Sequence, residues 1–549
     1  MTGNNWLWLG LFLAAIVGMV VVTGWRTRQR LRRRLLASWG EFPEARRQDS
    51  EASLKAAWQA AAQLRPTASQ VDDLTWHDLN LMAVFKHLNQ TESSVGAEAL
   101  YAALRGFDFD RPNVSAKLVA FFTEQDAVRL QVRTAFAHLG KSDDNQSRRY
   151  LLDTAHYRLS GTWRYTVLGW LPLAAIVLIV LAPLAGVLLL IGSLVTNVVV
   201  YQQHRERLAV ELNALRYLVQ TIATAQRLAR LATPQQAALK RALVKLAPIT
   251  RHAFVFRTKT GSETEIIADY LGVMLMLPFR AYNKVLTTLS AHHEDALALW
   301  QALGELEVAI AVANYQLAAP VVCHPQRQAT GITAAGVVHP LLKQPVANVI
   351  DWGQSALITG SNASGKSTYV KSVAINAVLA QTLGVATAES FALAPGHVIT
   401  AMAIQDDLAS GDSYFIAEIK AIQRVLTLAA GGAPVYGFID EILKGTNTVE
   451  RIAASAGVVQ WLTATQALVM VATHDSELTG LLGAAVVNWH FQETVSATGV
   501  AFDYLLHQGP ATSHNAIALL ATLNYPATII EQARNLAETF ERTHAWPRG

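Results

Sequence analysis

The stretch that decides the fold runs from residue 355 to residue 368 and reads Ser-Ala-Leu-Ile-Thr-Gly-Ser-Asn-Ala-Ser-Gly-Lys-Ser-Thr. Residues 356–359 predict a short buried strand, and residues 360–368 fit the pattern G-x-x-x-x-G-K-[ST], which is followed by a predicted helix at 369–383. In such a loop the glycines let the backbone curl until its N–H groups face phosphate oxygens. The pattern identifies six candidate nucleotide-binding residues, namely Gly360, Ser364, Gly365, Lys366, Ser367 and Thr368. Lys366 is expected to reach the β- and γ-phosphates, and the Ser367 hydroxyl to bind Mg²⁺.

Two more apolar runs, 435–439 and 468–472, predict further strands of the same sheet. They end in Asp440-Glu441 and in Thr473-His474. Carboxyl ends of parallel strands meet at one edge, so we expect these side chains to lie near the phosphate loop. Asp440 then holds Mg²⁺, Glu441 orients or deprotonates the attacking water, and His474 reaches the γ-phosphate. The sequence therefore predicts an ATP hydrolase with ATP and Mg²⁺ as cofactors.

Composition limits the other classes of protein. The chain has 549 residues, 52% hydrophobic and 16% charged, and a mean hydropathy of +0.24. Ordinary globular chains carry about 25% charged residues, so the composition argues against disorder and against a wholly soluble enzyme. A net charge of +4 is too small over this length to indicate nucleic-acid binding. The single cysteine, Cys323, excludes an intramolecular disulfide framework and a multi-cysteine zinc site.

The first apolar segment, residues 6–25, is long enough to cross a bilayer as a helix. Trp6, Trp8 and Trp25 stand near its ends, and six arginines follow within residues 26–34. By the positive-inside rule these arginines hold that end in the cytoplasm. A cleavable signal peptide would carry its charge before the apolar run, so we expect an uncleaved anchor with its N-terminus outside.

The second apolar segment, residues 166–200, has no charge over 35 residues. It predicts a hairpin of two short crossings that turns near Pro183 and Gly186. Arg164 before it and Arg205 after it place both ends in the cytoplasm. One tilted crossing is the alternative, but it would put the C-terminal half outside, away from ATP. We therefore favour three crossings and predict a multi-pass protein of the inner or plasma membrane, with its ATPase domain in the cytoplasm.

The remaining residues read as mostly helical. An apolar stripe runs from 208 to 231, and a second helical run covers 297–315. The cluster at 292–295, His-His-Glu-Asp, is predicted to be a solvated helix start and not a metal site. The expected organisation is an anchor at 1–36, a helical region at 37–163, the hairpin at 164–201, a helical lever at 202–334 and the ATPase domain at 335–549.

The motifs in this order resemble the ATPase domain of the MutS family, within the ABC ATPase class. The stretches that carry the resemblance are 338–342 with Asn348, 360–368 with Asn362 at its third position, 410–418, 440–448 with His474, and 509–534. The resemblance implies that Asn348 and Asn362 lie close to the nucleotide and that Ser413 enters the ATP site of a partner subunit. The fold class it implies is an α/β P-loop ATPase domain of ABC/MutS type after a mainly α-helical core and lever region, with transmembrane helices.

The resemblance implies an ATPase that forms a homodimer around two ATP molecules and binds DNA, with a role in mismatch repair or DNA damage sensing. The apolar segments add the expectation that this ATPase is anchored in a membrane. The resemblance does not reach the N-terminus, where we expect the anchor and no mismatch-recognition domain. Two alternatives remain open. An ABC-type transport ATPase would carry Leu-Ser-Gly-Gly-Gln before Asp440, and this sequence does not. An ATP-clasped membrane tether that binds no DNA would have the same motifs.

Overall fold

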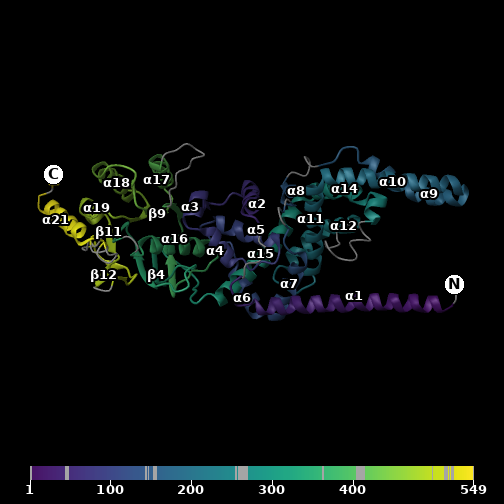
Figure 1. Cartoon of the computed structure of the whole chain (residues 1–549), viewed down its shortest axis with the longest axis horizontal. Helices are drawn as coiled ribbons and strands as arrows, with labels where there is room; N and C mark the ends of the chain where they lie inside the picture. Colours follow the sequence, from purple (N-terminus) through teal and green to yellow (C-terminus); the bar gives the residue numbers. More distant parts are fainter. Residues whose placement is uncertain are drawn as a thin grey trace. The chain divides into compact units, whose positions relative to one another are not determined.

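The structure is a computed structural model. It describes residues 3–43, 49–142, 145, 147–152, 158–253, 256, 270–361, 364–402, 414–496, 499–511, 517, 520, 525–543 and 545–547. The chain divides into two compact units, drawn with their elements in Figure 1. Unit 1 comprises residues 1–66, 88–102 and 114–318, and unit 2 comprises residues 67–87, 103–113 and 319–549. Unit 2 therefore includes two short pieces that the sequence grouped with the helical region at 37–163.

The regular secondary structure that is described in unit 1 consists of helices. These are α1 (Gly3–Ala37), α2 (Glu51–Leu64), α5 (Ser94–Arg105), α6 (Ala116–Glu124), α7 (Asp126–Leu139), α8 (Ser147–Leu152), α9 (Trp163–Leu181), α10 (Pro183–Arg207), α11 (Ala209–Leu228), α12 (Gln236–His252), α14 (Leu277–Ala291) and α15 (His293–Ala318). The predicted stripe lies on α11, where Leu215, Leu218 and Ile222 are fully buried. The helical run predicted at 297–315 is confirmed within α15, which is buried along most of its length.

Helices α9 and α10 form a hairpin, and the chain turns at Ala182 and Pro183, as the sequence predicted. Among the described residues, three helices are long and apolar enough to cross a membrane by length and composition, namely α9, α10 and α15. The apolar window of α15 is 78% buried, which identifies it as a core helix, whereas those of α9 and α10 are each 22% buried. The predicted anchor at 6–25 lies in α1, where several side chains, Trp6 among them, fall outside the described set.

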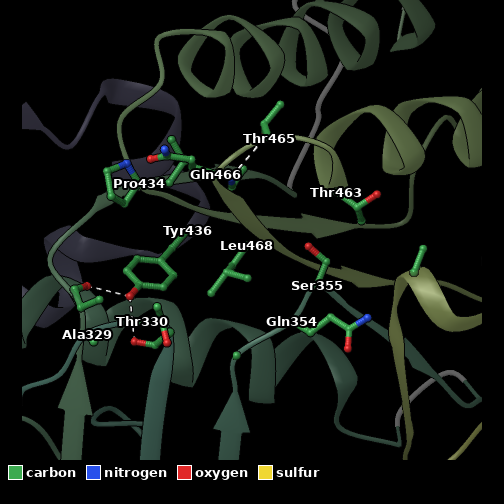
Figure 2. Close-up of a pocket in the computed structure, with 16 residues that line it drawn as sticks. Ala329, Thr330, Gln354, Ser355, Pro434, Tyr436, Thr463, Thr465, Gln466 and Leu468 are labelled. Carbon is green, nitrogen blue, oxygen red and sulfur yellow. Dashed lines mark hydrogen bonds between the residues drawn. The ribbon is translucent and has the colours of Figure 1, made fainter.

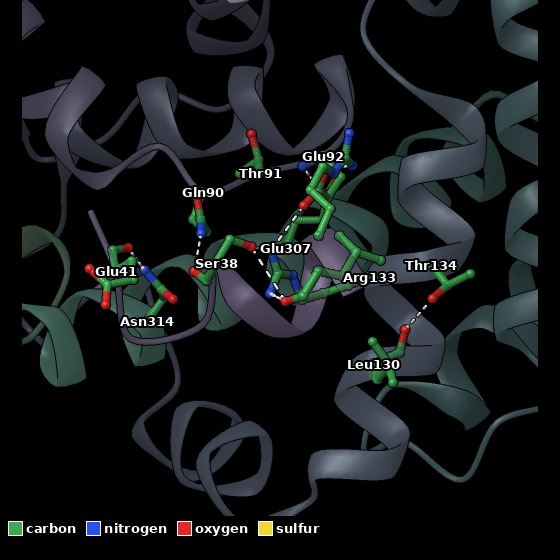
Figure 3. A network of polar contacts seen from close by, with 12 residues as sticks. Ser38, Glu41, Gln90, Thr91, Glu92, Leu130, Arg133, Thr134, Glu307 and Asn314 are labelled. Carbon is green, nitrogen blue, oxygen red and sulfur yellow. Dashed lines mark hydrogen bonds and ion pairs between the residues drawn. The ribbon is translucent and has the colours of Figure 1, made fainter. Parts of the chain in front are cut away.

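A network of polar side chains fixes the C-terminal end of α1 to the rest of unit 1 (Figure 3). Arg133 donates to the Leu35 carbonyl at 2.7 Å, to the Ser38 hydroxyl at 2.9 Å and to Glu92 at 3.0 Å. Asn314 accepts from the Gly40 N–H and donates to the Glu41 carbonyl, both at 2.9 Å. Buried polar groups with several partners of this kind hold a single geometry.

Unit 2 contains a six-stranded sheet in the order β14-β11-β6-β10-β9-β8. The strands are β6 (Ala356–Thr359), β8 (His397–Ala401), β9 (Val435–Asp440), β10 (Ala467–Ala472), β11 (Val487–His490) and β14 (His507–Gln508). All neighbours are parallel except β11 and β14. The three predicted strands are thus confirmed as the adjacent strands β6, β10 and β9. Their side chains are buried almost throughout, as expected when helices cover both faces.

The other elements of unit 2 surround this sheet. The helices are α3 (Asp73–Asp78), α4 (Leu81–Leu88), α16 (Lys366–Thr382), α17 (Tyr414–Ala430), α18 (Thr448–Thr463), α19 (Glu477–Leu482) and α21 (Ala527–Thr543). A second sheet has the order β3-β7-β4-β5 and consists of Gln326–Arg327, Ser390–Leu393, Ile332–Val337 and Asn348–Trp352. Two antiparallel pairs complete the unit, β1 (Ser69–Gln70) with β2 (Gly106–Phe107), and β12 (Glu493–Ser496) with β13 (Gly499–Phe502).

Candidate functional site

The loop between β6 and α16 has the backbone that its glycines allow. Gly360 has a φ of +139° and Gly365 a φ of +106°, values that side chains disfavour. A Cβ at Gly360 would also lie 2.6 Å from the Phe491 carbonyl oxygen. Helix α16 begins immediately after this loop, so its N–H groups and its positive end face the same space. The described part of the loop therefore has the geometry of an anion site.

Lys366 lies at the first position of α16 and is almost fully buried. Its ammonium donates to the carbonyl oxygens of Gly360 at 2.8 Å and Ser361 at 2.7 Å. Burial lowers the pKa of Lys366 to about 8, against the attraction of the carboxylates of Asp440, Glu441 and Glu493. A buried cation beside three carboxylates is a group that a polyphosphate would stabilise.

Glu441 and His474 meet at the ends of two neighbouring strands. Asp440 and Ala472 are paired in the β9–β10 register, and the Glu441 N–H donates to the Ala472 carbonyl at 2.8 Å. His474 Nε2 lies 3.0 Å from Glu441 Oε1, and Lys444 forms an ion pair with the other oxygen. The hydrogen bond from His474, with help from Lys444 and against burial, lowers the pKa of Glu441 to about 2. Glu441 is therefore ionised at neutral pH.

These residues line a cavity of about 350 Å³. Of the predicted site residues, those that line it are Asn348, Gly365, Lys366, Ser367, Thr368, Glu441 and His474. Ser364 is buried beside it, with its hydroxyl donating to the Ser361 carbonyl at 2.9 Å. Asp440 ends β9 next to Glu441 without lining the cavity. Asn362 and Ser413 lie outside the described residues, so their predicted roles stay predictions.

Two acidic residues outside the cavity form hydrogen bonds that position the segments next to Glu441 and His474. Glu418 of α17 is buried and accepts from the Lys444 N–H at 2.8 Å and the Gly445 N–H at 3.2 Å. Asp475 receives two hydrogen bonds from Arg451 of α18, at 2.9 and 2.6 Å. The first contact orders the loop after Glu441, and the second orders the residue after His474.

The sequence analysis missed three side chains of this site. Glu493 accepts a hydrogen bond from the Ser361 hydroxyl at 2.8 Å, and its carboxylate raises the pKa of Lys366 against the effect of burial. Phe491 and Tyr504 line the cavity, and the Tyr504 ring would lie 3.1 Å from a Cβ at Gly365. Phe491 and Glu493 follow β11, which pairs with β6. The rule that function follows strand ends would have found them had 487–490 been recognised as a strand.

The donors at this site fit magnesium in the presence of a polyphosphate. Mg²⁺ takes few protein ligands and completes its shell with phosphate oxygens and water. Ser367 supplies a hydroxyl and Asp440 a carboxylate. Among the described residues no group of three or more His, Cys, Asp or Glu side chains is arranged to hold a metal. The site suits an ion that arrives with its nucleotide better than a permanently bound metal.

A second cavity, of about 460 Å³, lies at the amino-terminal ends of β9 and β10 (Figure 2). The Tyr436 hydroxyl at its edge lies 2.8 Å from the Gly331 carbonyl and 2.6 Å from the Ala394 carbonyl. None of its sixteen lining residues is charged. It therefore offers no charged side chain to a polyphosphate, although it is the larger of the two cavities.

Fold and site together define an α/β domain with a candidate anion site at the carboxyl edge of its parallel strands. Residues 356–541 match the family model described as MutS domain V. The DNA mismatch repair protein MutS of Natronomonas pharaonis is 30% identical over 271 residues, which are 47% of this chain and 31% of that protein. The DNA mismatch repair protein MutS 2 of Halobacterium salinarum is 31% identical over 219 residues, 38% of this chain and 25% of that protein.

Over residues 356–541 the chain is related to MutS domain V, which supports the resemblance that its motifs indicated. It spans less than a third of the length of these two curated relatives.

Proposed function

We propose that this protein is a membrane-anchored, Mg²⁺-dependent ATP hydrolase of the MutS type. One observation carries the proposal: Lys366, Glu441 and His474, from three separate segments, line a single cavity after a glycine-bounded loop. A cation for phosphate, a carboxylate for water and a histidine beside it are the parts that nucleotide hydrolysis needs.

The chemistry assigns one task to each residue. The loop N–H groups and Lys366 bind the β- and γ-phosphates, and Ser367 and Asp440 hold Mg²⁺, which neutralises charge on the phosphate oxygens. The Glu441 carboxylate orients or deprotonates the attacking water, and His474, 3.0 Å from it, reaches the γ-phosphate.

The apolar part of the cavity suits the base of the nucleotide. Pro345, Val346 and Tyr504 line it together with Asn348. Asn348 holds the Tyr504 segment in place, since its amide donates to the Tyr504 carbonyl at 3.0 Å and accepts from the Leu506 N–H at 2.8 Å. An aromatic ring on an apolar wall is a stacking surface for a purine.

Dimerisation and DNA binding belong to the same proposal. The two relatives are named for DNA mismatch repair. By the family resemblance two copies close on two ATP molecules, with Ser413 of each copy completing the site of the other, and the closed homodimer binds DNA.

The membrane part rests on α1 and the α9–α10 hairpin. The large apolar side chains along α9 and α10 are exposed over most of the hairpin, a surface that water disfavours. We place the protein in the inner or plasma membrane with unit 2 in the cytoplasm, where ATP is present.

The test uses the full chain in detergent, because residues 67–87 and 103–113 belong to unit 2 and a fragment from residue 202 would lose them. ATP turnover is measured at low salt with and without duplex DNA, for the parent chain and for Lys366→Ala. We expect turnover in the parent that DNA stimulates and none in the variant. Equal turnover in both proteins refutes the hydrolase, and turnover indifferent to DNA at low salt favours the ATP-clasped tether.

A further inference from the structure

The length and the packing of the α9–α10 hairpin limit how deeply it can enter a membrane. We propose that this hairpin enters one leaflet, turns inside the hydrocarbon and returns, and that it does not reach the far side. The proposal rests on the membrane association proposed above and is independent of the ATP chemistry. It replaces two of the three predicted crossings with a re-entrant element.

Packing against the helical body sets how much of the hairpin is free to enter lipid. The Asn197 amide of α10 donates to the Leu168 carbonyl of α9 at 3.0 Å and to the Met274 carbonyl at 2.7 Å. The Arg280 guanidinium of α14 lies 5.5 Å from the centre of the Trp170 ring. At this level the hairpin is covered on one face by the rest of unit 1.

Arg280 also locates the surface of the membrane. A guanidinium is costly inside hydrocarbon, whereas an exposed tryptophan favours the interface. Trp170 is exposed and has Arg280 beside it. The hydrocarbon therefore begins at Trp170 or farther along α9 toward the turn.

The length beyond that boundary is too short for a crossing. The twelve residues from Trp170 to Leu181 rise about 18 Å as a helix. On α10 the thirteen residues from Pro183 to Val195 rise about 20 Å. The hydrocarbon of a bilayer is about 30 Å thick, so the turn stops past the middle and roughly 10 Å short of the far headgroups.

The turn has the chemistry of a segment that stays in lipid. Val180, Leu181 and Leu184 around it are among the most exposed large apolar side chains described. Ala182 is the one residue between the helices; its N–H donates to the Leu178 carbonyl at 2.7 Å, and its carbonyl accepts from the Gly186 N–H at 2.9 Å. Pro183 has no N–H to satisfy. A turn in water would favour Gly, Asn, Asp or Ser, whereas this one is apolar.

Figure 1 shows the outer part of the hairpin projecting from the body of unit 1. No charged residue stands between Arg164 and Arg205. The exposed large side chains between Trp170 and Val195 are all apolar, and hydrocarbon is the surrounding that suits them. A hairpin of this kind wedges into the cytoplasmic leaflet and does not reach the opposite surface of the membrane.

The single native cysteine makes the test direct. In a Cys323→Ser background, Leu181→Cys places a thiol at the turn and Val244→Cys places one on α12 in the body of unit 1. The two side chains they replace are apolar and comparably exposed, 79% and 74%. The full chain is placed in sealed vesicles, with right-side-out and inside-out vesicles prepared separately. Each preparation is treated, before and after detergent is added, with a charged maleimide that does not cross membranes.

We expect Cys at 244 to react from the cytoplasmic face alone, and Cys at 181 to react from neither face until detergent is added. Reaction of Cys at 181 from the face opposite to Cys at 244 means a full crossing and overturns the proposal. Reaction of both from the same face means that the hairpin is in water, which also overturns it. Extraction of the chain by alkaline carbonate would instead refute membrane anchoring itself.

A depth measurement gives a second, independent readout. A fluorophore on Cys at 181 is quenched by lipids brominated at different acyl positions. We expect the strongest quenching from bromine near the ends of the acyl chains. The turn is proposed to lie past the middle of the hydrocarbon, more than half its thickness from the headgroups of the leaflet that the hairpin enters. Strongest quenching from bromine near the headgroups would contradict the proposed depth.

Discussion

The backbone of Glu441 is as informative as its carboxylate. Its φ is +58°, a conformation that few residues other than glycine adopt, and its N–H is tied to Ala472 of the next strand. Such a conformation is retained where the surrounding structure enforces it, and here it points a carboxylate at His474 and Lys444.

Glu441→Gln is expected to slow ATP hydrolysis by about 10²- to 10⁴-fold and to leave ATP binding nearly intact, because the amide cannot take a proton from water. Single-turnover hydrolysis and nucleotide titration measure the two effects separately. Glu531→Gln on the exposed face of α21 is the matched control and should change neither. Unchanged turnover in Glu441→Gln would remove Glu441 from the mechanism.

Lys366 predicts how ATP affinity depends on pH. Burial lowers its pKa to about 8 in the free protein. A polyphosphate stabilises the ammonium, so the complex holds a proton that the free protein loses above pH 8. Affinity should be constant below pH 8 and fall by up to tenfold per pH unit above it. Titrations from pH 6.5 to 9.5 measure this, and Lys366→Arg, whose charge persists, should flatten the profile. A flat profile in the parent would show that this ammonium does not contact phosphate.

At the scale of elements, α3 closes the edge of the six-stranded sheet. Asp78 is buried and accepts from the Thr400 hydroxyl at 2.6 Å and from the Met402 N–H at 3.0 Å. Arg424 of α17 forms an ion pair with Asp72 in front of the same helix. A segment more than 300 residues away in the chain thus caps the edge strand β8 of the sheet.

Removing this contact should loosen β8 first. Asp78→Ala leaves the buried Thr400 hydroxyl and the half-buried Met402 N–H without their acceptor. The buried hydroxyl then costs about 1–3 kcal/mol, and the N–H costs less because water can reach it. We expect faster hydrogen exchange in the peptide covering 397–402 than in the parent chain. Asp351→Ala, at an exposed position of β5, is the control and should leave that peptide unchanged. Equal exchange in Asp78→Ala would mean that α3 does not stabilise the edge.

The sequence predicted the elements whose signals are local. The strands at 356–359, 435–439 and 468–472 are short apolar runs that end in polar residues, and the turn at Pro183 stands in an uncharged segment. It did not predict Glu493 or the α3–β8 contact, because both depend on which distant strands become neighbours. The proposed depth of the hairpin was also out of reach of the sequence, because it rests on contacts with Arg280 and Met274, which are remote from the hairpin in the chain.

At the scale of the whole molecule, the chain passes between the two units several times before residue 319. Residues 67–87 and 103–113 belong to unit 2 and the residues between them to unit 1, and helix α5 contributes to both. Neither unit is one continuous piece of sequence. An N-terminal truncation that extends past residue 66 therefore removes parts of both, and experiments on function need the full chain.

Unit 1 holds two fully buried carboxyl groups that make its stability depend on pH. Burial raises the pKa of Glu98 to about 7, with Arg148 and Asn145 opposing and Asp49 adding to the rise. Burial also raises the pKa of Glu307 to about 7, against hydrogen bonds from Ser93 and the Glu92 N–H. The folded unit therefore binds protons more tightly than the unfolded chain between pH 4.5 and 7.

Stability from these groups is fully present below pH 4.5 and is lost as the pH rises through 7. We expect the melting temperature of unit 1 to be several degrees lower at pH 7.5 than at pH 5.5. Glu98→Gln has no titratable proton, and its amide oxygen can still accept the hydrogen bond that the Asn145 side-chain amide donates to Glu98 Oε1 at 2.7 Å. It should remove about half of this dependence, whereas Glu206→Gln on the exposed end of α10 should leave it whole. A melting temperature that rises with pH over this range would mean that both carboxylates are ionised in the folded unit and that their neighbours more than offset their burial.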